Sequence, residues 1–162
     1  MTGYGYWRGP LPLRWVYFHV LRELAQHCGH ADILRLTEEQ ARRLLVPSRT
    51  TLLGLVKHAT FVEKVWFDEA VTGRSRAEIG IPAISDESFI LQDDDTIASV
   101  QQAHREACQS SRLATSTLGL DDRVHGYWRG PLPLRWVYLH VLRELAQHCG
   151  HADILREQIL NQ

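Results

Sequence analysis

The sequence predicts an all-α fold, a four-helix bundle formed by one domain over residues 1–162. Three observations support this fold class. The chain of 162 residues is long enough to enclose one hydrophobic core. Its hydrophobic fraction of 44% and charged fraction of 23% are ordinary for a globular protein. Apolar residues recur at helical spacing in four long segments, without a convincing strand pattern elsewhere. We therefore expect four helices, antiparallel or mixed in direction, around one core.

A duplicated segment supplies two of these four helices. Residues 5–35 recur as residues 126–156, with a single difference, Phe18 in the first copy and Leu139 in the second. Two copies separated by unrelated sequence do not make a solenoid, whose repeats must stack on their neighbours. The near-identity indicates either a recent duplication or an artefact of how the sequence was assembled.

The helix boundaries in and after the first copy follow from proline and capping residues. In each copy the second proline of Arg-Gly-Pro-Leu-Pro can occupy the first helical turn, where its missing N–H costs nothing. We expect helices over about 12–35 and 133–159. Thr37 and Gln40 have the spacing of a capping box, which predicts a short helix over 38–45.

The two middle helices are bounded in the same way. Ser48 or Thr50 can cap a helix that Gly73 ends. Residues 73–95 combine glycine, proline, serine and acidic residues without a period, and they read as a long crossover loop. Three aspartates then precede a helix over about 96–113, where negative charge suits the helix dipole.

Composition excludes several classes of partner. The net charge is −1 without a basic block, so we expect no nucleic-acid binding. No apolar run approaches the roughly twenty residues that span a bilayer, and no signal peptide is evident. Three cysteines make a disulfide framework improbable, so we expect a protein of the reducing cytoplasm.

One face of the last helix carries side chains that can bind a metal. His140, Glu144, His148 and His151 fall within an arc of about 80° on a helical wheel. The apolar residues of this helix share or border the arc, so the face should be buried. A buried unpaired carboxylate is costly unless it neutralises or finds a partner such as a cation, an arginine or a histidine. Cys149 faces away from the arc, and we expect it to be a buried, inert thiol.

His58 is a further candidate ligand from the second helix. It lies in the apolar stripe of that helix, where a single histidine is more often a hydrogen-bonded core residue than a ligand. Opposite a second helix with Glu-x-x-x-His on its own buried face, the metal interpretation becomes the stronger one. Three nitrogen and oxygen ligands with open positions are typical of a catalytic rather than a structural site.

The stretches VPSRTTLLGLVKHATFVEKVWFDEAVTG (46–73) and RGPLPLRWVYLHVLRELAQHCGHADILREQ (129–158) resemble the DinB-like (YfiT-like) superfamily. The resemblance covers residues from about 36 to 158 and is closest to the actinobacterial branch, which includes the metal-binding domain of mycothiol-dependent maleylpyruvate isomerase. It implies a four-helix bundle in which His58, Glu144 and His148 hold a divalent metal, with His151 an additional ligand or a neighbour of the site. Zinc is the first choice of metal, and nickel or iron the alternative.

The resemblance fails at the N-terminus, where the sequence of the fourth helix replaces an unrelated amphipathic helix. The second copy follows the helix order of the superfamily, so we assign the ligands to it. The first copy could still pack as the first helix, and it would then place Glu23 and His27 on a buried face near the same metal.

The resemblance also implies the chemistry. Members use low-molecular-weight thiols such as mycothiol or bacillithiol in transferase, isomerase or hydrolase reactions. We expect a divalent-metal-binding protein that acts on a small electrophile, either as a mycothiol-type thiol transferase or as a metal-dependent hydrolase, and that forms a homodimer. The alternative is a non-catalytic helical bundle that binds metal or dimerises.

Overall fold

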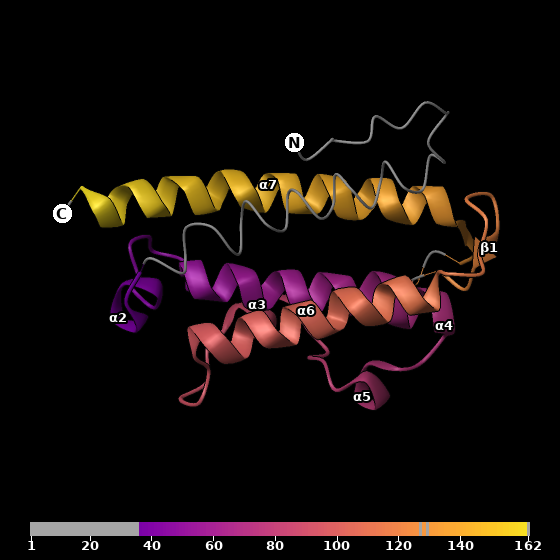
Figure 1. The fold of residues 1–162 in the computed structure, drawn as a ribbon, viewed down its shortest axis with the longest axis horizontal. Coiled ribbons are helices and arrows are strands. Elements are labelled where there is room, and N and C mark those ends of the chain that lie inside the picture. The colour runs from indigo at the N-terminus through magenta and orange to yellow at the C-terminus, as the bar shows by residue number, and fades with distance from the viewer. Residues whose placement is uncertain (1–35, 127, 129, 162) are drawn as a thin grey trace, which may run out of the picture.

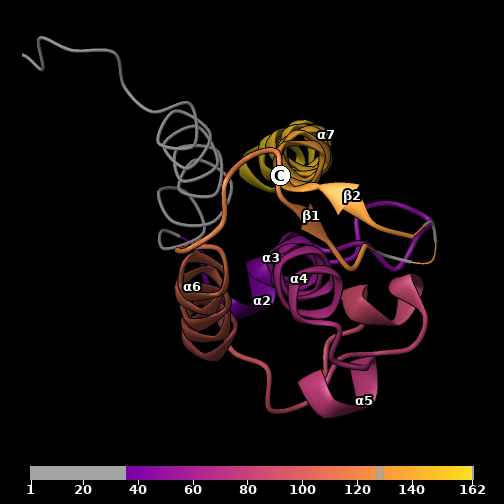
Figure 2. The ribbon, with the colours of Figure 1, turned by 90° about the vertical axis from the view of Figure 1, so that its right-hand side faces the viewer.

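Three long helical segments dominate the computed structural model, which describes residues 36–126, 128 and 130–161. They are α3 (Leu52–Glu63) with its continuations, α6 (Ile97–Ala114) and α7 (Leu134–Leu160). They lie side by side along the long axis, and the end-on view shows them at the corners of a triangle (Figures 1 and 2). The prediction of an all-α bundle is confirmed. The fourth helix, expected over 12–35 and containing Glu23 and His27, lies outside the described residues.

The first long segment is one continuous rod made of three consecutive helical segments. α3 leads into the π-helix η2 (Lys64–Glu69) and then into α4 (Ala70–Thr72). Gly73 ends the rod, as predicted, in a left-handed conformation with φ of 77°. The N-terminal cap is Thr51, whose hydroxyl accepts a 2.9 Å hydrogen bond from the backbone of Gly54.

The expectation that Ser48 or Thr50 caps this helix is wrong. Their two hydroxyls bond to each other at 3.1 Å, and the chain turns into the helix only at the following threonine. Upstream, the short helix α2 (Glu38–Ala41) has the predicted capping box between Thr37 and Gln40. It ends four residues earlier than the predicted limit of 45.

The crossover after the rod contains short helices that the sequence did not predict. They are α5 (Arg76–Ile79) and the 3₁₀ helix η3 (Ser85–Phe89). The crossover returns the chain to the other end of the bundle, so α6 runs in the same direction as α3 (Figure 1). Thr96 caps α6 through a capping box with Ser99, in agreement with the predicted start of this helix.

A small hairpin connects α6 to α7. Two strands of two residues each, β1 (Arg123–Val124) and β2 (Leu132–Pro133), pair antiparallel. The sequence predicted no strands, and this prediction is wrong for these four residues. α7 starts immediately after β2 and runs opposite to α3 and α6, as its colour gradient shows in Figure 1.

The core lies between the rod and α7. Buried side chains from both elements and from β1 form its main cluster; they are Phe61, Val62, Val65, Phe67, Val124, Leu134, Val137, Tyr138, Val141 and Leu145. A second cluster at the other end joins α3 to the C-terminal half of α7, around Leu55 and Leu155. Burial of these apolar surfaces holds α3 against α7 along their whole length.

The structure also bears on the predictions about the cysteines and about membrane-spanning helices. Cys149 is half-buried and disulfide-bonded, so its assignment as a buried free thiol is wrong, whereas Cys108 is a free thiol. Within the described part of the chain, no helix has both the length and the apolar character needed to cross a membrane.

Candidate functional site

The antiparallel contact between the rod and α7 brings polar and aromatic side chains into two groups. His58 on α3 meets His148 on α7, with ring centroids 4.7 Å apart. Trp66, eight residues after His58 on the rod, meets His140, eight residues before His148 on α7, with ring centroids 4.3 Å apart. Equal steps in opposite directions are what antiparallel helices impose. Glu144 lies between the two groups on α7.

Hydrogen bonds fix the orientation of the His58 imidazole. His58 is 4% exposed, and its Nδ1 lies 2.7 Å from the hydroxyl of Ser88. That hydroxyl has a single proton, which it donates to the backbone carbonyl of Ser85. It can therefore only accept from His58, which places the imidazole proton on Nδ1 and leaves a lone pair on Nε2.

Phe89 covers the same imidazole. Its ring stacks on that of His58 with centroids 3.8 Å apart and planes 13° from parallel, and it lies 5.9 Å from the ring of His148. Phe89 reaches this position because η3 approaches α3 closely at Gly54. A Cβ atom at Gly54 would lie 2.7 Å from the carbonyl oxygen of Phe89. The glycine one turn before His58 thus allows an aromatic cover over the imidazole pair.

His148 contributes a polar atom without a partner. Its Nδ1 is buried and has no hydrogen-bond partner. Burial lowers the pKa of His148, and the nearby His151 lowers it further, against the opposing effect of Glu144. Burial, helped by the neighbouring His148, lowers the pKa of His58 to about 4. Both imidazoles are therefore neutral near pH 7 and have lone pairs for a Lewis acid.

Glu144 lies beside the imidazole pair and is shared between two histidines of its own helix. Its carboxylate oxygens are 3.9 Å from Nε2 of His140 and 4.0 Å from Nε2 of His148. Its side chain is 29% exposed, so it faces the edge of the helix contact rather than the centre of the core.

The structure thus brings together some of the predicted ligands and not others. His58 and His148 converge, Glu144 is adjacent to His148, and the exposed His151 has its ring centroid 5.9 Å from that of His148. Among the residues that the structure describes, no three histidine, cysteine or acidic side chains are gathered closely enough to hold a metal ion as they stand. The paired imidazoles form the nucleus of the candidate site.

An aromatic group that the sequence analysis did not identify adjoins Glu144. The rings of Trp136 and His140 stack with centroids 4.9 Å apart and planes 8° from parallel, and Trp66 closes the group with its centroid 5.5 Å from Trp136. The spacing of Trp136, His140, Glu144 and His148 at four-residue intervals is a signal that could have revealed it. Ser88 and Phe89 had no comparable signal, because they lie in a segment without a period.

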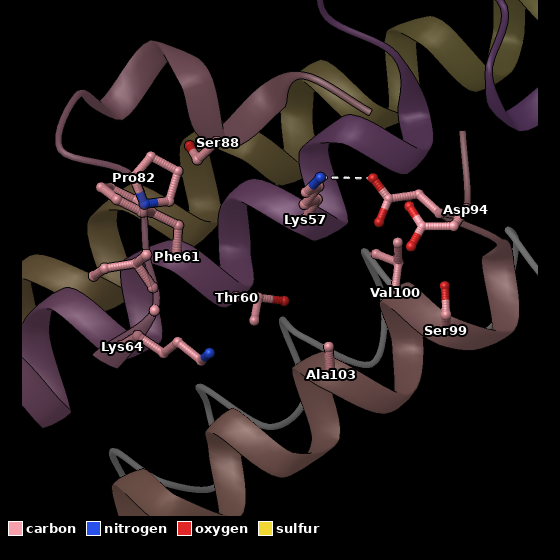
Figure 3. A pocket seen from close by; sticks show the side chains of 13 residues that line it. Lys57, Thr60, Phe61, Lys64, Pro82, Ser88, Asp94, Ser99, Val100 and Ala103 are labelled. Atoms are coloured by element: carbon pink, nitrogen blue, oxygen red, sulfur yellow. Dashed lines mark hydrogen bonds and ion pairs between the residues drawn. The ribbon is translucent and has the colours of Figure 1, made fainter. Parts of the chain in front are cut away.

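A cavity of about 340 Å³ lies on a different face of α3, between this helix, α6 and the crossover segment (Figure 3). Neither His58 nor His148 is among the described residues that line it. Ser88 is one of its lining residues, so one serine borders both the cavity and the imidazole pair.

A family model described as mycothiol S-transferase matches residues 2–35 and 36–160. The chain belongs to the mycothiol S-transferase family. The second matched segment by itself spans most of the chain and contains His58, Glu144 and His148, while the first coincides with the N-terminal copy of the repeat. No curated protein matches the chain.

Membership of the mycothiol S-transferase family confirms the resemblance seen in the sequence. The family name indicates a low-molecular-weight thiol as substrate. The described residues bring together two imidazoles, a neighbouring carboxylate and a group of stacked aromatic rings.

Proposed function

We propose that this protein transfers the thiol of mycothiol to a small electrophile, with a divalent metal held by His58, Glu144 and His148. The observation that carries the proposal is the convergence of two neutral imidazoles, one with a buried unpartnered nitrogen. Zinc is the first choice, and nickel or iron the alternative, because mixed nitrogen and oxygen ligands discriminate poorly among these ions.

The donor atoms are of the types that bind zinc and similar divalent cations. The Nε2 lone pair of His58 is set by the hydrogen bond from its Nδ1 to Ser88, an arrangement common for metal-binding histidines. His148 has an unpartnered nitrogen for the same purpose. The Glu144 side chain is partly exposed, and its oxygens lie 3.9 Å from His140 and 4.0 Å from His148, too far for a hydrogen bond to either; a rotamer change would bring its carboxylate to the pair. His151 is the further candidate, from the rim of the site.

Bound there, a divalent cation would supply Lewis acidity that lowers the pKa of a thiol and makes it nucleophilic near neutral pH. The protein's own residues do the rest. Phe89 excludes water from one side of the imidazole pair. The stacked rings of Trp136 and His140, with Trp66, offer an apolar surface beside Glu144 on which a small electrophile can lie.

Metal analysis of purified protein tests the ligand assignment. We expect about one ion per chain in the native protein and none in the double variant His58→Ala, His148→Ala. His125→Ala is the matched control, because His125 is exposed and distant from the pair in the bundle. Equal metal content in the double variant and the control would show that the site is elsewhere.

The duplication offers a second, internally matched test. Glu144→Ala with His148→Ala should abolish metal binding, whereas the same two changes in the first copy, Glu23→Ala with His27→Ala, should leave it intact. Loss of binding in the second pair instead of the first would assign the site to the N-terminal copy.

The reaction is tested with mycothiol and a panel of small electrophiles. Consumption of the thiol that depends on both the metal and the electrophile supports a transferase. Hydrolysis of the electrophile without loss of thiol supports the metal-dependent hydrolase. Metal binding without either reaction would leave the non-catalytic bundle as the function. We also propose a homodimer without a nucleic-acid partner, and light scattering of the purified protein measures the dimer directly.

A further inference from the structure

The cavity between α3, α6 and the crossover has a preformed rim. At one end Lys57 donates to the carboxylate of Asp95 at 2.6 Å and to the carbonyl of Ile90 at 3.0 Å. Arg42 donates to the carbonyl of Gln92 at 3.0 Å and also to that of Asp95. These bonds tie the end of the crossover to α3 and to the segment after α2, so the cavity exists without a ligand to organise it.

Charge is distributed unevenly within the cavity. The charge of Lys57 is neutralised by Asp95. Lys64, two turns further along the rod, is half-buried and makes no hydrogen bond or ion pair with another described residue. Figure 3 shows its ammonium group reaching into the space between the rod and α6, level with Ala103 and away from Asp94. One end of the cavity therefore presents an unpaired cation.

The surface between the two ends is largely apolar. Phe61 from α3, Val100 from α6, and Ile81 and Pro82 from the crossover line it. A partly desolvated ammonium beside apolar walls is stabilised by an anion that brings its own apolar body. Because Lys57 is paired with Asp95, Lys64 and Asp94 are the remaining charges of the described lining. One lysine suits a singly charged anion, and Asp94 disfavours a multiply charged anion such as phosphate. A volume of about 340 Å³ is at the small end of ligand pockets.

We propose that this cavity binds a small organic monocarboxylate, whose carboxylate pairs with Lys64 and whose apolar body lies against Phe61 and Ile81. The site is separate from the imidazole pair, since on a helical wheel Lys57 and Lys64 lie about 100–120° away from His58. Binding of the carboxylate therefore does not depend on the proposed metal.

Calorimetric titration of the metal-free protein, kept in chelator, with hexanoate and octanoate tests the proposal. We expect saturable binding at one site per chain, with the neutral amides of the same chain lengths binding at least tenfold more weakly. Lys64→Met keeps the length of the side chain and removes the charge, so it should weaken carboxylate binding at least tenfold and leave amide binding unchanged. Arg49→Met, which removes an exposed positive charge outside the cavity, is the control and should change neither.

Two further variants separate this site from the metal site and from a folding defect. Ala103→Leu fills the cavity and should weaken both the carboxylates and the amides, with circular dichroism showing that the helices remain. His58→Ala with His148→Ala should bind octanoate as the native protein does. The proposal is overturned by the absence of saturable binding, by equal binding of acid and amide, by an unaffected Lys64→Met variant, or by loss of binding in the histidine variant.

Discussion

A buried carboxyl group at the end of α3 should make the stability of the protein depend on pH. Glu63 is 5% exposed, and its carboxylate accepts a 2.7 Å hydrogen bond from the hydroxyl of Ser111 on α6. Burial raises the pKa of Glu63 from 4.5 to about 7, although Ser111 and Arg112 favour the charged form. The folded protein therefore binds the proton more tightly than the unfolded chain does.

The sign and size of the effect follow from proton linkage. The contribution of Glu63 is fully present below pH 4.5, where both states are protonated, and it is lost as the pH rises to about 7. A shift from 4.5 to about 7 corresponds to about 3 kcal/mol of stability at 1.36 kcal/mol per pKa unit. Of this, about 2.5 kcal/mol should be lost between pH 5 and pH 8.

Urea unfolding followed by circular dichroism at several pH values between 5 and 8 measures this loss. Glu63→Gln keeps the shape and an acceptor oxygen for Ser111 but cannot ionise, so the variant should become the more stable protein as the pH rises. The difference between native protein and variant should change by about 2.5 kcal/mol across the range. Glu157→Gln on the exposed side of α7 is the control and should run parallel to the native protein. A Glu63→Gln curve that also runs parallel would refute the reasoning.

Two further predictions concern the support of the imidazole pair. Ser88→Ala removes the acceptor that fixes the His58 tautomer and should weaken metal binding about 10- to 100-fold in a metal titration, whereas Ser85→Ala keeps the backbone carbonyl and should not. Gly54→Ala places a Cβ atom 2.7 Å from a backbone oxygen of η3 and should destabilise the protein by about 1–3 kcal/mol in urea unfolding. Gly150→Ala is its control, since nothing lies within 4 Å of a Cβ atom there and alanine should stabilise the helix by about 0.5–1 kcal/mol; equal effects of the two glycine substitutions would contradict the close approach.

Local signals in the sequence predicted several of the helix ends, although not the cap of α3 or the end of α2. The capping box of Thr37 and Gln40, the glycine at position 73 and the aspartates before position 96 act over a few residues, and the helix ends that they predicted are found in the structure. The hairpin of β1 and β2 escaped prediction because two-residue strands are too short to show a period. The short helix α5 did have a local signal, the capping-box spacing of Ser75 and Glu78, which the sequence analysis missed.

Some residues of the candidate site could be predicted from the sequence and others could not. Helical periodicity predicted that His58 and His148 lie on the core-facing sides of their helices, and the family resemblance implied that they meet. The positions of Ser88 and Phe89 depend on how the crossover segment packs on α3. Gly54 allows this packing because it contacts the backbone of Phe89, 35 residues away in sequence. Such tertiary contacts leave no mark in local spacing, so the covering and orienting residues could only be found in the structure.

The π-helix η2 lies between the part of the rod that carries His58 and the part that contacts the hairpin, so changes in chain length within η2 affect these two parts differently. Its hydrogen bonds reach five residues back instead of four, so the rotation of the chain about the helix axis lags behind that of an α-helix there. A residue gained or lost within Lys64–Glu69 would rotate everything downstream, including Ala70, whose carbonyl accepts a 3.0 Å hydrogen bond from Gly126 of the hairpin segment. His58 precedes η2 in the chain and would keep its position on α3. Insertions and deletions in η2 can therefore remodel the hairpin end of the bundle while the position of His58 on α3 stays the same.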